Sequence, residues 1–552
     1  MFLFLALVLW ITCSAVYIVA MLFSARHFIH MFQLNSYKPK VHFKWLWVNE
    51  RKYFVLTTIQ LLFGLSLPVF LLADLLTTDE FVTWLVLSST YLAIILPLVL
   101  IVLMVPIIVM KHPKKAYKTP LVYTLRVKRL IATLAAINAI VWLIAVLIGK
   151  NNSQFIFTLP AACALTLFLL PVTMLLANLL NRPLELAINK HYINDAKRIL
   201  AGCKNLTVIG ITGSFGKTSV KYFLDTLLSV KFNVLKTPGN FNTPLGVVKT
   251  IRGSLRATHD IFLCEMGAKN VGDIKEICDI VHPKHGIITS VGPMHLESFK
   301  TLDNVKKTKF ELADALPDGS GMLFLNVDDE NVITHATEMN YNWIAYGIDN
   351  KSGYSVSDLR ISEKGSEFKV TAPDGTVCDY RTKLIGRHNV LNVAGAIAVA
   401  SKMGISLEEL RPAVRKLESV PHRLELINKG AYTVIDDAYN SNPSGTKAAL
   451  EALSMTDGYR ILVTPGMIEL GEMESQLNRE FGENAASVCD FVALVGKKQT
   501  EAIYEGLVNA GFDKEKIYVA DSLNDAMANV YGLTTDGKRK IILLENDLPD
   551  NY

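Results

Sequence analysis

The chain has 552 residues, of which 51% are hydrophobic and 19% are charged, and its formal net charge is +5. Soluble domains carry about 25% charged residues, so this composition excludes a disordered chain and indicates a membrane portion beside a soluble one. A net charge of +5 is small for this length, and we therefore expect no nucleic-acid partner.

Apolar windows dominate the first third of the chain. Five windows contain no Asp, Glu, Lys or Arg, and they cover residues 1–24, 53–73, 81–110, 130–149 and 155–180. Each reaches the length of about 20 residues that crosses the hydrocarbon layer of a bilayer. We therefore predict a membrane region of five helices at residues 1–180, with the lipid bilayer as a partner.

The charges between these windows predict an orientation. The segments 25–52 and 111–129 are rich in Lys and Arg, whereas the segment 74–80 carries only acidic charges. Because cytoplasmic loops are enriched in basic residues, we expect the N-terminus outside the cell and everything after residue 180 in the cytoplasm. We therefore expect a multi-pass protein of the plasma membrane with cytoplasmic catalytic domains. The two basic segments are either topology signals alone or also contacts for anionic head groups.

The remainder of the chain has the pattern of α/β domains. Short apolar runs alternate with helical segments, for example at 206–211, 260–265, 286–291 and 321–326, and a second series has strands at 432–435, 459–463, 491–495 and 540–544. This alternation predicts parallel sheets, with a β excursion at the sheet edge over 352–383. We expect a connector at 181–204, a central domain at 205–383 and a C-terminal domain at 384–552.

One glycine-rich segment predicts nucleotide chemistry. Gly210-Ile-Thr-Gly-Ser-Phe-Gly-Lys-Thr-Ser219 follows an apolar strand and precedes a helical run. In a phosphate loop, backbone N–H groups surround the phosphates, Lys217 reaches the β- and γ-phosphates, and the Thr218 hydroxyl binds Mg²⁺. The strict pattern requires Gly where this chain has Ile211. We expect ATP and Mg²⁺ as cofactors.

The phosphate loop and further motifs resemble those of the Mur ligases, which join a carboxylate to an amine with ATP. In the order of the family, the chain has Pro238-Gly-Asn-Phe-Asn-Thr-Pro-Leu-Gly246, Cys264-Glu-Met-Gly-Ala268, Gly292-Pro-Met-His-Leu-Glu297, Lys309-Phe-Glu311, Leu325-Asn-Val-Asp-Asp329, Gly386-Arg-His-Asn-Val-Leu-Asn392, Pro421-His-Arg-Leu-Glu425 and Ile435-Asp-Asp-Ala-Tyr-Asn-Ser-Asn-Pro443. The branch that adds D-alanyl-D-alanine to a muramoyl tripeptide is the most similar. The resemblance implies a Mur-ligase-like central ATPase domain, a Rossmann-like C-terminal domain and an acyl-phosphate intermediate.

The resemblance also implies roles for particular residues. The catalytic set is Lys217, Glu265, His295 and Lys309. The metal ligands are Thr218, Glu265, His295 and, if it is carbamylated, Lys309. The ATP-binding residues are Gly213, Ser214, Gly216, Lys217, Thr218, Ser219, His388, Asn389, Arg423, Asp437 and Tyr439. Asn240 and Asn242 belong to a loop that covers the substrate. Since these residues lie on two domains, we expect the C-terminal domain to close onto the central one.

Three departures from the family affect the substrates. The apolar region occupies the position of the domain that holds the UDP-muramoyl group in soluble relatives. The family segment Gly-Asp-Met-x-Glu-Leu-Gly is here Pro465-Gly-Met-Ile-Glu-Leu-Gly471, and the chain has Glu545-Asn-Asp547 where relatives have a basic strand end. The last two changes fall in the domain that receives the amine. We therefore expect a retained catalytic centre with altered substrate sites.

The leading hypothesis is a membrane-anchored ligase of peptidoglycan or other cell-envelope precursor synthesis. Its substrates would be a carboxylate acceptor, lipid-linked or not, and an amino-acid or dipeptide amine. The alternatives are a polyglutamate synthetase-like ligase, an ATP-driven transporter and an inactive membrane scaffold. The transporter is disfavoured because the predicted spans carry no Asp, Glu, Lys or Arg that would form a coupling path.

Overall fold

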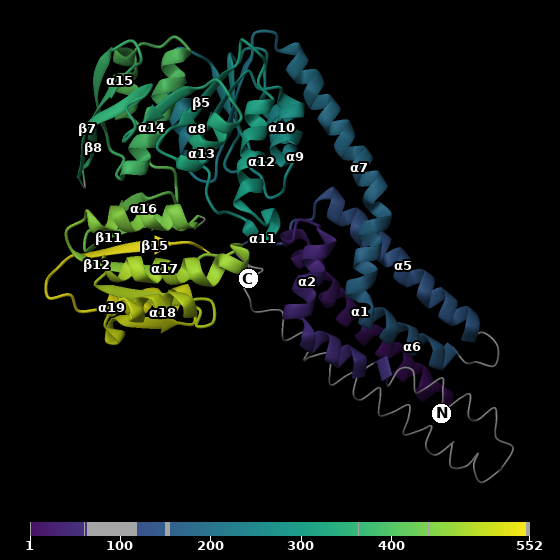
Figure 1. Ribbon diagram of the computed structural model, residues 1–552. Coiled ribbons are helices and arrows are strands. Elements are labelled where there is room, and N and C mark those ends of the chain that lie inside the picture. Colours follow the sequence, from purple (N-terminus) through teal and green to yellow (C-terminus); the bar gives the residue numbers. More distant parts are fainter. Residues whose placement is uncertain are drawn as a thin grey trace. The chain divides into compact units, whose positions relative to one another are not determined.

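The computed structural model describes residues 2–59, 61–62, 119–149, 155–362, 364–439 and 441–547 (Figure 1). The chain divides into two compact units, Met1–Asn189 and Lys190–Leu548. The described residues of the first unit form the helices α1 (Phe2–Leu34), α2 (Pro39–Asn49), α5 (Leu125–Gly149), α6 (Phe155–Phe168) and α7 (Leu170–Gly202), the last of which continues into the second unit.

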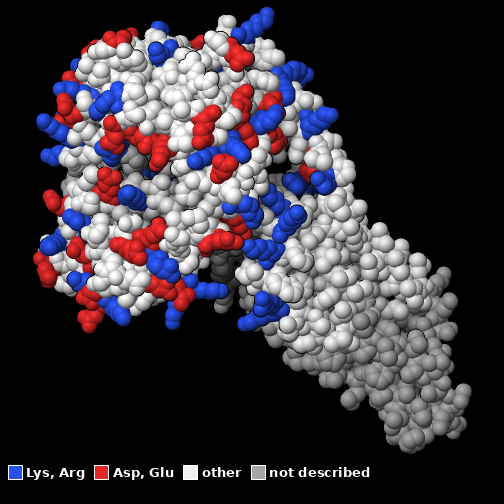
Figure 2. All heavy atoms as spheres, in the orientation of Figure 1, with Lys and Arg blue, Asp and Glu red and all other residues white. Residues whose placement is uncertain are grey.

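The described part of the first unit does not confirm five spans. One of its helices, α5, is long and apolar enough to cross a membrane, over Leu125–Ile148, and α6 with α7 adds a second if the pair is one broken span. The predicted window 81–110 and most of 53–73 lie outside the described residues. Figure 2 shows the described surface of this unit with few charged side chains beyond one basic cluster.

The fifth predicted window is bent rather than straight. The axes of α6 and α7 differ by 70°. Pro171, at the second position of α7, has no N–H, so the Leu167 carbonyl loses its partner one turn earlier. The buried Tyr53 hydroxyl instead donates to that carbonyl at 2.5 Å. The predicted connector 181–204 is also not a separate segment, because it continues α7 to Gly202.

The second unit begins with a nine-stranded sheet. Its strands, in the spatial order β2-β3-β1-β4-β5-β6-β7-β8-β9, are β2 (Val234–Lys236), β3 (Ile261–Glu265), β1 (Thr207–Thr212), β4 (His285–Ile288), β5 (Met322–Asn326), β6 (Ile344–Gly347), β7 (Tyr354–Ser362), β8 (Gly365–Thr371) and β9 (Val377–Thr382). The pairs up to β6–β7 are parallel, and β7–β8–β9 are antiparallel. The predicted strands of this domain and the β excursion at the sheet edge are confirmed.

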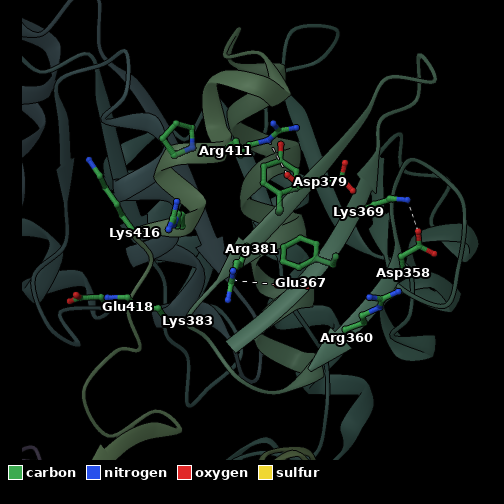
Figure 3. Close-up of a pocket in the computed structure, with 14 residues that line it drawn as sticks. Asp358, Arg360, Glu367, Lys369, Asp379, Arg381, Lys383, Arg411, Lys416 and Glu418 are labelled. Carbon is green, nitrogen blue, oxygen red and sulfur yellow. Dashed lines mark hydrogen bonds and ion pairs between the residues drawn. The ribbon is translucent and has the colours of Figure 1, made fainter. Parts of the chain in front are cut away.

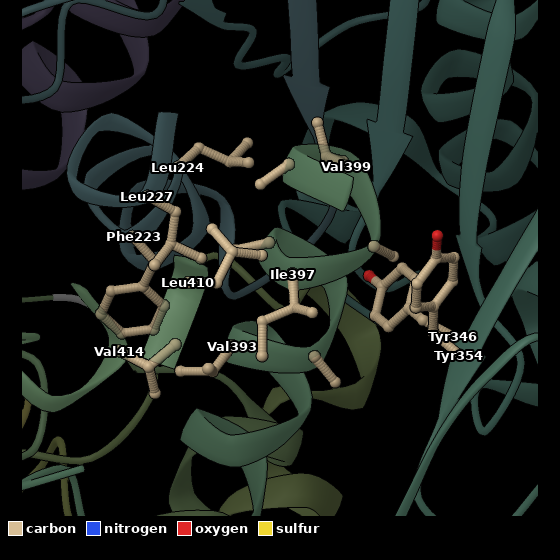
Figure 4. Packing of buried hydrophobic residues seen from close by; sticks show 14 of the residues in the cluster. Phe223, Leu224, Leu227, Tyr346, Tyr354, Val393, Ile397, Val399, Leu410 and Val414 are labelled. Atoms are coloured by element: carbon tan, nitrogen blue, oxygen red, sulfur yellow. The ribbon is translucent and has the colours of Figure 1, made fainter. Parts of the chain in front are cut away.

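Helices cover both faces of this sheet, as parallel strands require. One face carries α8 (Lys217–Leu228), α14 (Arg387–Lys402) and α15 (Leu407–Arg415), whose apolar side chains form one core (Figure 4). The other carries α9 (Pro244–Ser254), α10 (Asp273–Val281), α12 (Leu302–Asp314) and α13 (Glu330–Glu338). Since α14 and α15 pack on this sheet, its domain extends beyond residue 383, where the sequence predicted its end.

The second sheet of this unit has six strands. Their spatial order is β10-β11-β15-β12-β13-β14, with β10 (Glu425–Asn428), β11 (Tyr432–Asp437), β15 (Lys540–Glu545), β12 (Tyr459–Thr464), β13 (Phe491–Val495) and β14 (Ile517–Ala520). Apart from the β10–β11 hairpin the pairs are parallel. The helices α16 (Pro443–Ser454), α17 (Glu474–Ala486) and α18 (Glu501–Asn509) pack on one face, and α19 (Leu523–Gly532) packs on the other. The predicted strands are again confirmed.

Candidate active site

The glycine-rich segment forms a tight turn between β1 and α8. Gly213 and Gly216 have φ angles of +149° and +81°, which favour glycine. A Cβ atom at Gly213 would lie 2.0 Å from Oγ1 of Thr289, so the turn also lacks room for a side chain. The Lys217 amine donates to the carbonyls of Gly213 and Ser214 at 2.7 and 3.0 Å. The turn therefore encircles the lysine and opens at the N-terminus of a helix, where anions bind.

The neighbouring strand β3 brings a carboxylate to this turn. β1 and β3 are parallel partners, with Ile211 opposite Glu265, so both strands end at the same edge of the sheet. The Thr218 hydroxyl and the Asn242 amide each donate to Oε1 of Glu265 at 3.1 Å. A hydroxyl beside a carboxylate is an oxygen donor set that suits Mg²⁺. The structure thus brings together three residues that the sequence predicted for metal and substrate.

Lys221, for which the sequence predicted no role, completes this cluster. Its amine lies 2.8 Å from Oε2 of Glu265 and donates to the Gly239 carbonyl at 2.5 Å, and its side chain is fully buried. Burial would raise the pKa of Glu265, but the charges of Lys221 and Lys217 outweigh burial and lower it. The sequence does carry one signal for the role of Lys221. It lies four residues after Lys217, a spacing that places both lysines on one face of α8.

His295 follows β4 and is the N-cap of the short helix α11 (Leu296–Phe299), with a φ of +50°. Its Nδ1 contacts Oε2 of Glu469, and the Lys269 amine contacts Oε1 of the same carboxylate at 2.9 Å. Burial lowers the pKa of His295 more than the Glu469 carboxylate raises it. Burial would raise the pKa of Glu469, but His295 and Lys269 lower it to about 2. Glu469 belongs to the second sheet's domain, and no role was predicted for it.

Lys309 lies on α12 with 2% of its surface exposed. Burial, followed by the positive charge of Lys217, lowers the pKa of its amine to about 7. Among the residues that the structure describes, no hydrogen bond or ion pair reaches this amine. With a pKa of about 7, roughly half of this amine is uncharged at neutral pH. The uncharged amine is the form that reacts with CO₂, so the setting fits the carbamate that the family resemblance implies.

The second domain brings two predicted residues, Arg423 and Tyr439, near the phosphate loop. The Arg423 guanidinium stacks 4.2 Å above the Tyr439 ring. Tyr439 shares a hydrogen bond with Asn240 of the substrate loop. The pKa of Lys217 is lowered to about 8, first by burial, and the positive charge of Arg423 contributes to this shift. Residues of both domains therefore lie near the phosphate loop, and their contacts with ATP stay predictions.

Asp437 lies at the end of β11, opposite Glu545 of β15. Burial raises the pKa of Asp437 to about 6 and the pKa of Glu545 well above its ordinary value. The Ser441 hydroxyl donates to Oε1 of Glu545 at 2.8 Å. Glu545, where the family resemblance implies a basic strand end, is therefore a buried carboxyl next to a predicted nucleotide-binding residue.

His388 and Asn389, the predicted adenine contacts, begin α14. The Asn389 amide donates to the Ile385 carbonyl at 2.9 Å. Burial lowers the pKa of His388 to about 4, so this ring is neutral. Their contact with adenine stays a prediction. Asn392, for which the sequence predicted no role, lies against the phosphate loop. A Cβ atom at Gly216 would come within 2.7 Å of its Oδ1.

The structure contains two further groups of polar side chains. His422, Glu425 and Asp436 form the one group of three His, Cys, Asp or Glu side chains within 4.8 Å among the described residues. A hollow of about 1340 Å³ lies over β7, β8, β9 and α15 and is lined mainly by charged side chains such as Arg360, Lys383, Arg415 and Lys416 (Figure 3). It contains none of the predicted site residues.

A phosphate loop at the carboxyl edge of a parallel sheet, faced by cationic residues of a second α/β domain, defines a nucleotide-dependent enzyme of two catalytic domains. Comparison with known families gives the particular class. The Mur ligase middle domain matches residues 211–400, and the Mur ligase glutamate ligase domain matches residues 422–544, together more than half of the chain. The chain belongs to the Mur ligase family, and it is an ATP-dependent enzyme that forms amide bonds.

Individual relatives support the assignment to the Mur ligase family. The UDP-N-acetylmuramoyl-tripeptide–D-alanyl-D-alanine ligase of Escherichia coli is 31% identical over 340 residues, which are 59% of this chain and 74% of that one. The Bacillus subtilis enzyme of the same name is 30% identical over 50% of this chain, and the chain spans only 59% of its length.

Solved structures show the same fold. MurF from Acinetobacter baumannii has a TM-score of 0.60 at 25% identity, covering 65% of this chain and 77% of that one. MurF ligase from Thermotoga maritima, solved with ADP, has a TM-score of 0.58 at 26% identity, covering 65% and 80%. The region before residue 190 is additional to the matched Mur ligase domains.

Proposed function

We propose that this protein is a membrane-anchored Mur ligase that adds an amino-acid or dipeptide amine to a carboxylate during peptidoglycan precursor synthesis. The cluster of Thr218, Lys221 and Glu265 beside the phosphate loop carries this proposal, because it joins the first turn of α8 to a carboxylate at the end of β3. The relatives named for D-alanyl-D-alanine addition support a dipeptide amine.

The reaction has two steps. A carboxylate oxygen of the acceptor attacks the γ-phosphorus of ATP, so that an acyl phosphate forms and ADP leaves. The amine then attacks the acyl carbon, an amide bond forms, and phosphate and a proton leave. Both steps concentrate negative charge on phosphoryl oxygens, which Lys217 and Arg423 are placed to stabilise. Thr218 and Glu265 would hold Mg²⁺, which neutralises further phosphoryl charge when bound.

The substitution Lys217→Ala tests this assignment. The lysine is required for phosphoryl charge rather than for packing, so the variant should fold but lose ATP-dependent ligation by more than about 100-fold. Phosphate release and mass spectrometry of the products, with candidate carboxylates and amines supplied together, measure the loss. The matched control is Lys307→Ala, which removes an exposed lysine of α12. A variant that keeps a tenth of wild-type turnover contradicts the assignment.

The exposed apolar surface of α5 supports a membrane anchor. Only 17% of its most apolar window is buried within the protein, and Leu143, Leu147 and Ile148 are each more than half exposed. A core helix of a soluble domain would bury these side chains, whereas lipid would cover them. We propose that α5 spans the membrane, with further spans among the predicted windows, and that the two α/β domains lie in the cytoplasm.

The region before the α/β domains bears on whether the acceptor is held in the membrane. A region of spans in place of a UDP-muramoyl domain fits an acceptor held in the membrane on a lipid carrier, with Mg²⁺ and ATP bound by the α/β domains. A chain that begins at Asn181 tests this, because Lys190–Leu548 is a compact unit with its own cores. It should bind ATP but lose ligation of a lipid-linked acceptor in detergent. Full-rate ligation of a water-soluble UDP-linked acceptor would leave the spans as an anchor alone.

A further inference from the structure

Glu469 connects the two α/β domains at a predicted metal ligand. It lies between β12 and α17 in the C-terminal domain, and its carboxylate contacts His295 and Lys269 of the central domain. The three side chains are 26%, 16% and 56% exposed, respectively, so His295 is the more enclosed partner. Glu469 has a φ of +64°, a conformation that non-glycine residues rarely adopt.

The backbone around Glu469 supports the same contact. The Glu297 N–H donates to the Glu469 carbonyl at 3.4 Å, so α11 and this segment meet through main chain as well as side chains. Two residues on, Gly471 has a φ of +64°, and a Cβ atom there would lie 3.4 Å from the Glu297 nitrogen. The segment is therefore held against α11 at two points, and His295 is the N-cap of that helix.

The contact also decides which ring nitrogen of His295 is available. A carboxylate that already accepts from the Lys269 ammonium has no hydrogen to donate, so Nδ1 of His295 must carry the hydrogen of this bond. In a neutral ring, Nε2 then presents its lone pair. No hydrogen bond to Nε2 occurs among the described residues. A carboxylate that orients a histidine through its far nitrogen is the usual support of a histidine metal ligand.

We propose that Glu469 is a positioning residue that orients His295 toward a metal ion, so that the metal site is complete only when the C-terminal domain is docked. The proposal rests on the proposed function, and on the family resemblance, which implies that His295 ligates a second Mg²⁺ beside the ion that Thr218 and Glu265 would hold. It assigns a role to the Glu of the Pro465-Gly-Met-Ile-Glu-Leu-Gly471 segment, which lies in the domain expected to receive the amine. The catalytic and amine-binding domains would thereby be coupled through one side chain.

The test uses the full chain in detergent with Mn²⁺ as the probe and a non-hydrolysable ATP analogue. Titration followed by electron paramagnetic resonance counts the bound ions and gives their affinities. Glu469→Gln and Glu469→Ala should weaken the second ion by about 10–100-fold and leave the first unchanged. Glu472→Gln, which alters an exposed carboxylate three residues on, is the matched control and should bind both ions normally.

A double variant separates positioning from simple packing. If Glu469 acts through His295, adding Glu469→Ala to His295→Ala should weaken the second ion no further than His295→Ala alone. Lys269→Met should have the smaller effect, since it leaves the bond to Nδ1 in place. Additive losses, unchanged or tighter Mn²⁺ binding in the Glu469 variants, or equal loss of both ions would overturn the proposal.

A distance measurement shows whether the domains still dock. Spin labels at Asp318→Cys and Asn509→Cys, both exposed, report the separation of the two domains. A broadened separation in the Glu469 variants with normal Mn²⁺ binding would make Glu469 a domain contact only, against the proposal. A wild-type chain without ATP-dependent ligation refutes the proposed function. Two bound ions in the wild type with none lost in His295→Ala refute the histidine's role, whatever the Glu469 variants show.

Discussion

Replacing Lys221 with methionine should destabilise the central domain strongly. The lysine is fully buried and pairs with Glu265 at 2.8 Å, while its amine also holds the Gly239 carbonyl of the substrate loop. Lys221→Met keeps most of the side-chain volume but removes the charge. Glu265, 1% exposed, then keeps its carboxylate in the interior with its principal cation removed.

The expected magnitude follows from this burial. Removing one partner of a buried ion pair costs about 3–5 kcal/mol, because the remaining charge stays desolvated. For a domain of this size, about 1 kcal/mol corresponds to about 2–4 °C, so the melting temperature should fall by about 6–20 °C. Lys307→Met provides the matched control, since its pair with Asp303 is exposed and worth at most about 1 kcal/mol.

The loss of stability in Lys221→Met should depend on pH. In the wild type the lowered pKa of Glu265 means that the ionised group stabilises the fold above its unfolded pKa of 4.5, and that this stability is lost as the pH falls through the folded pKa. Without Lys221, burial dominates and raises the pKa, so the variant loses stability as the pH rises. The deficit should therefore be larger at about pH 8 than at about pH 5.

Calorimetry of wild type, Lys221→Met, Lys307→Met and the double variant Lys221→Met/Glu265→Gln measures these effects. The double variant should recover part of the loss, because it removes the uncompensated charge. A Lys221→Met protein that melts within about 2 °C of the Lys307→Met control, or whose deficit is the same at both pH values, would refute the reasoning.

Three further predictions concern the phosphate loop and its surroundings. Gly213→Ala should destabilise the fold by about 1–3 kcal/mol and weaken nucleotide binding in calorimetric titration, because its Cβ atom would collide with Thr289, whereas Gly253→Ala, with open space, should not. Binding of an ATP analogue should weaken by up to about tenfold per pH unit above the pKa of Lys217, about 8, as the free enzyme loses that charge, and Lys217→Ala should lose this slope. Lys309, whose pKa is about 7, should give a carbamate signal in ¹³C nuclear magnetic resonance that grows from about pH 6 to about pH 8 at constant CO₂, and Lys309→Gln should lack it; no signal at either pH leaves an ordinary lysine.

The phosphate loop and the strand that ends in Glu265 could be predicted from the sequence, because both depend on neighbours in the chain. Glycines at positive φ, an apolar strand before them and a helix after them are local features, and the structure has each of them. The longer strands were also predicted. The strands β2, β6, β10 and β14 were not, since each has only three or four residues, too few to show a strand pattern.

The sequence did not predict how the helices of the membrane region bend or where the connector begins and ends. An apolar window predicts that a segment avoids water, but not whether its helix is straight. Pro171 and the Tyr53 hydroxyl decide the bend between α6 and α7, and these two residues are separated by most of the first unit. The polar residues after 180 continue α7 because backbone hydrogen bonds follow the helix irrespective of which solvent surrounds it.

The sequence by itself therefore determined the class of chemistry, and the tertiary structure decided how the site is assembled. The motif from Gly210 to Ser219 predicts phosphate binding from its place between a strand and a helix, since its N–H groups come from consecutive residues. The burial of Lys221 against Glu265 and the contact of Glu469 with His295, 174 residues apart in the chain, have no local signature. Such pairs form only when packing brings separate elements within a few ångströms, and the energy of a buried charge depends on that packing rather than on the residues beside it in sequence.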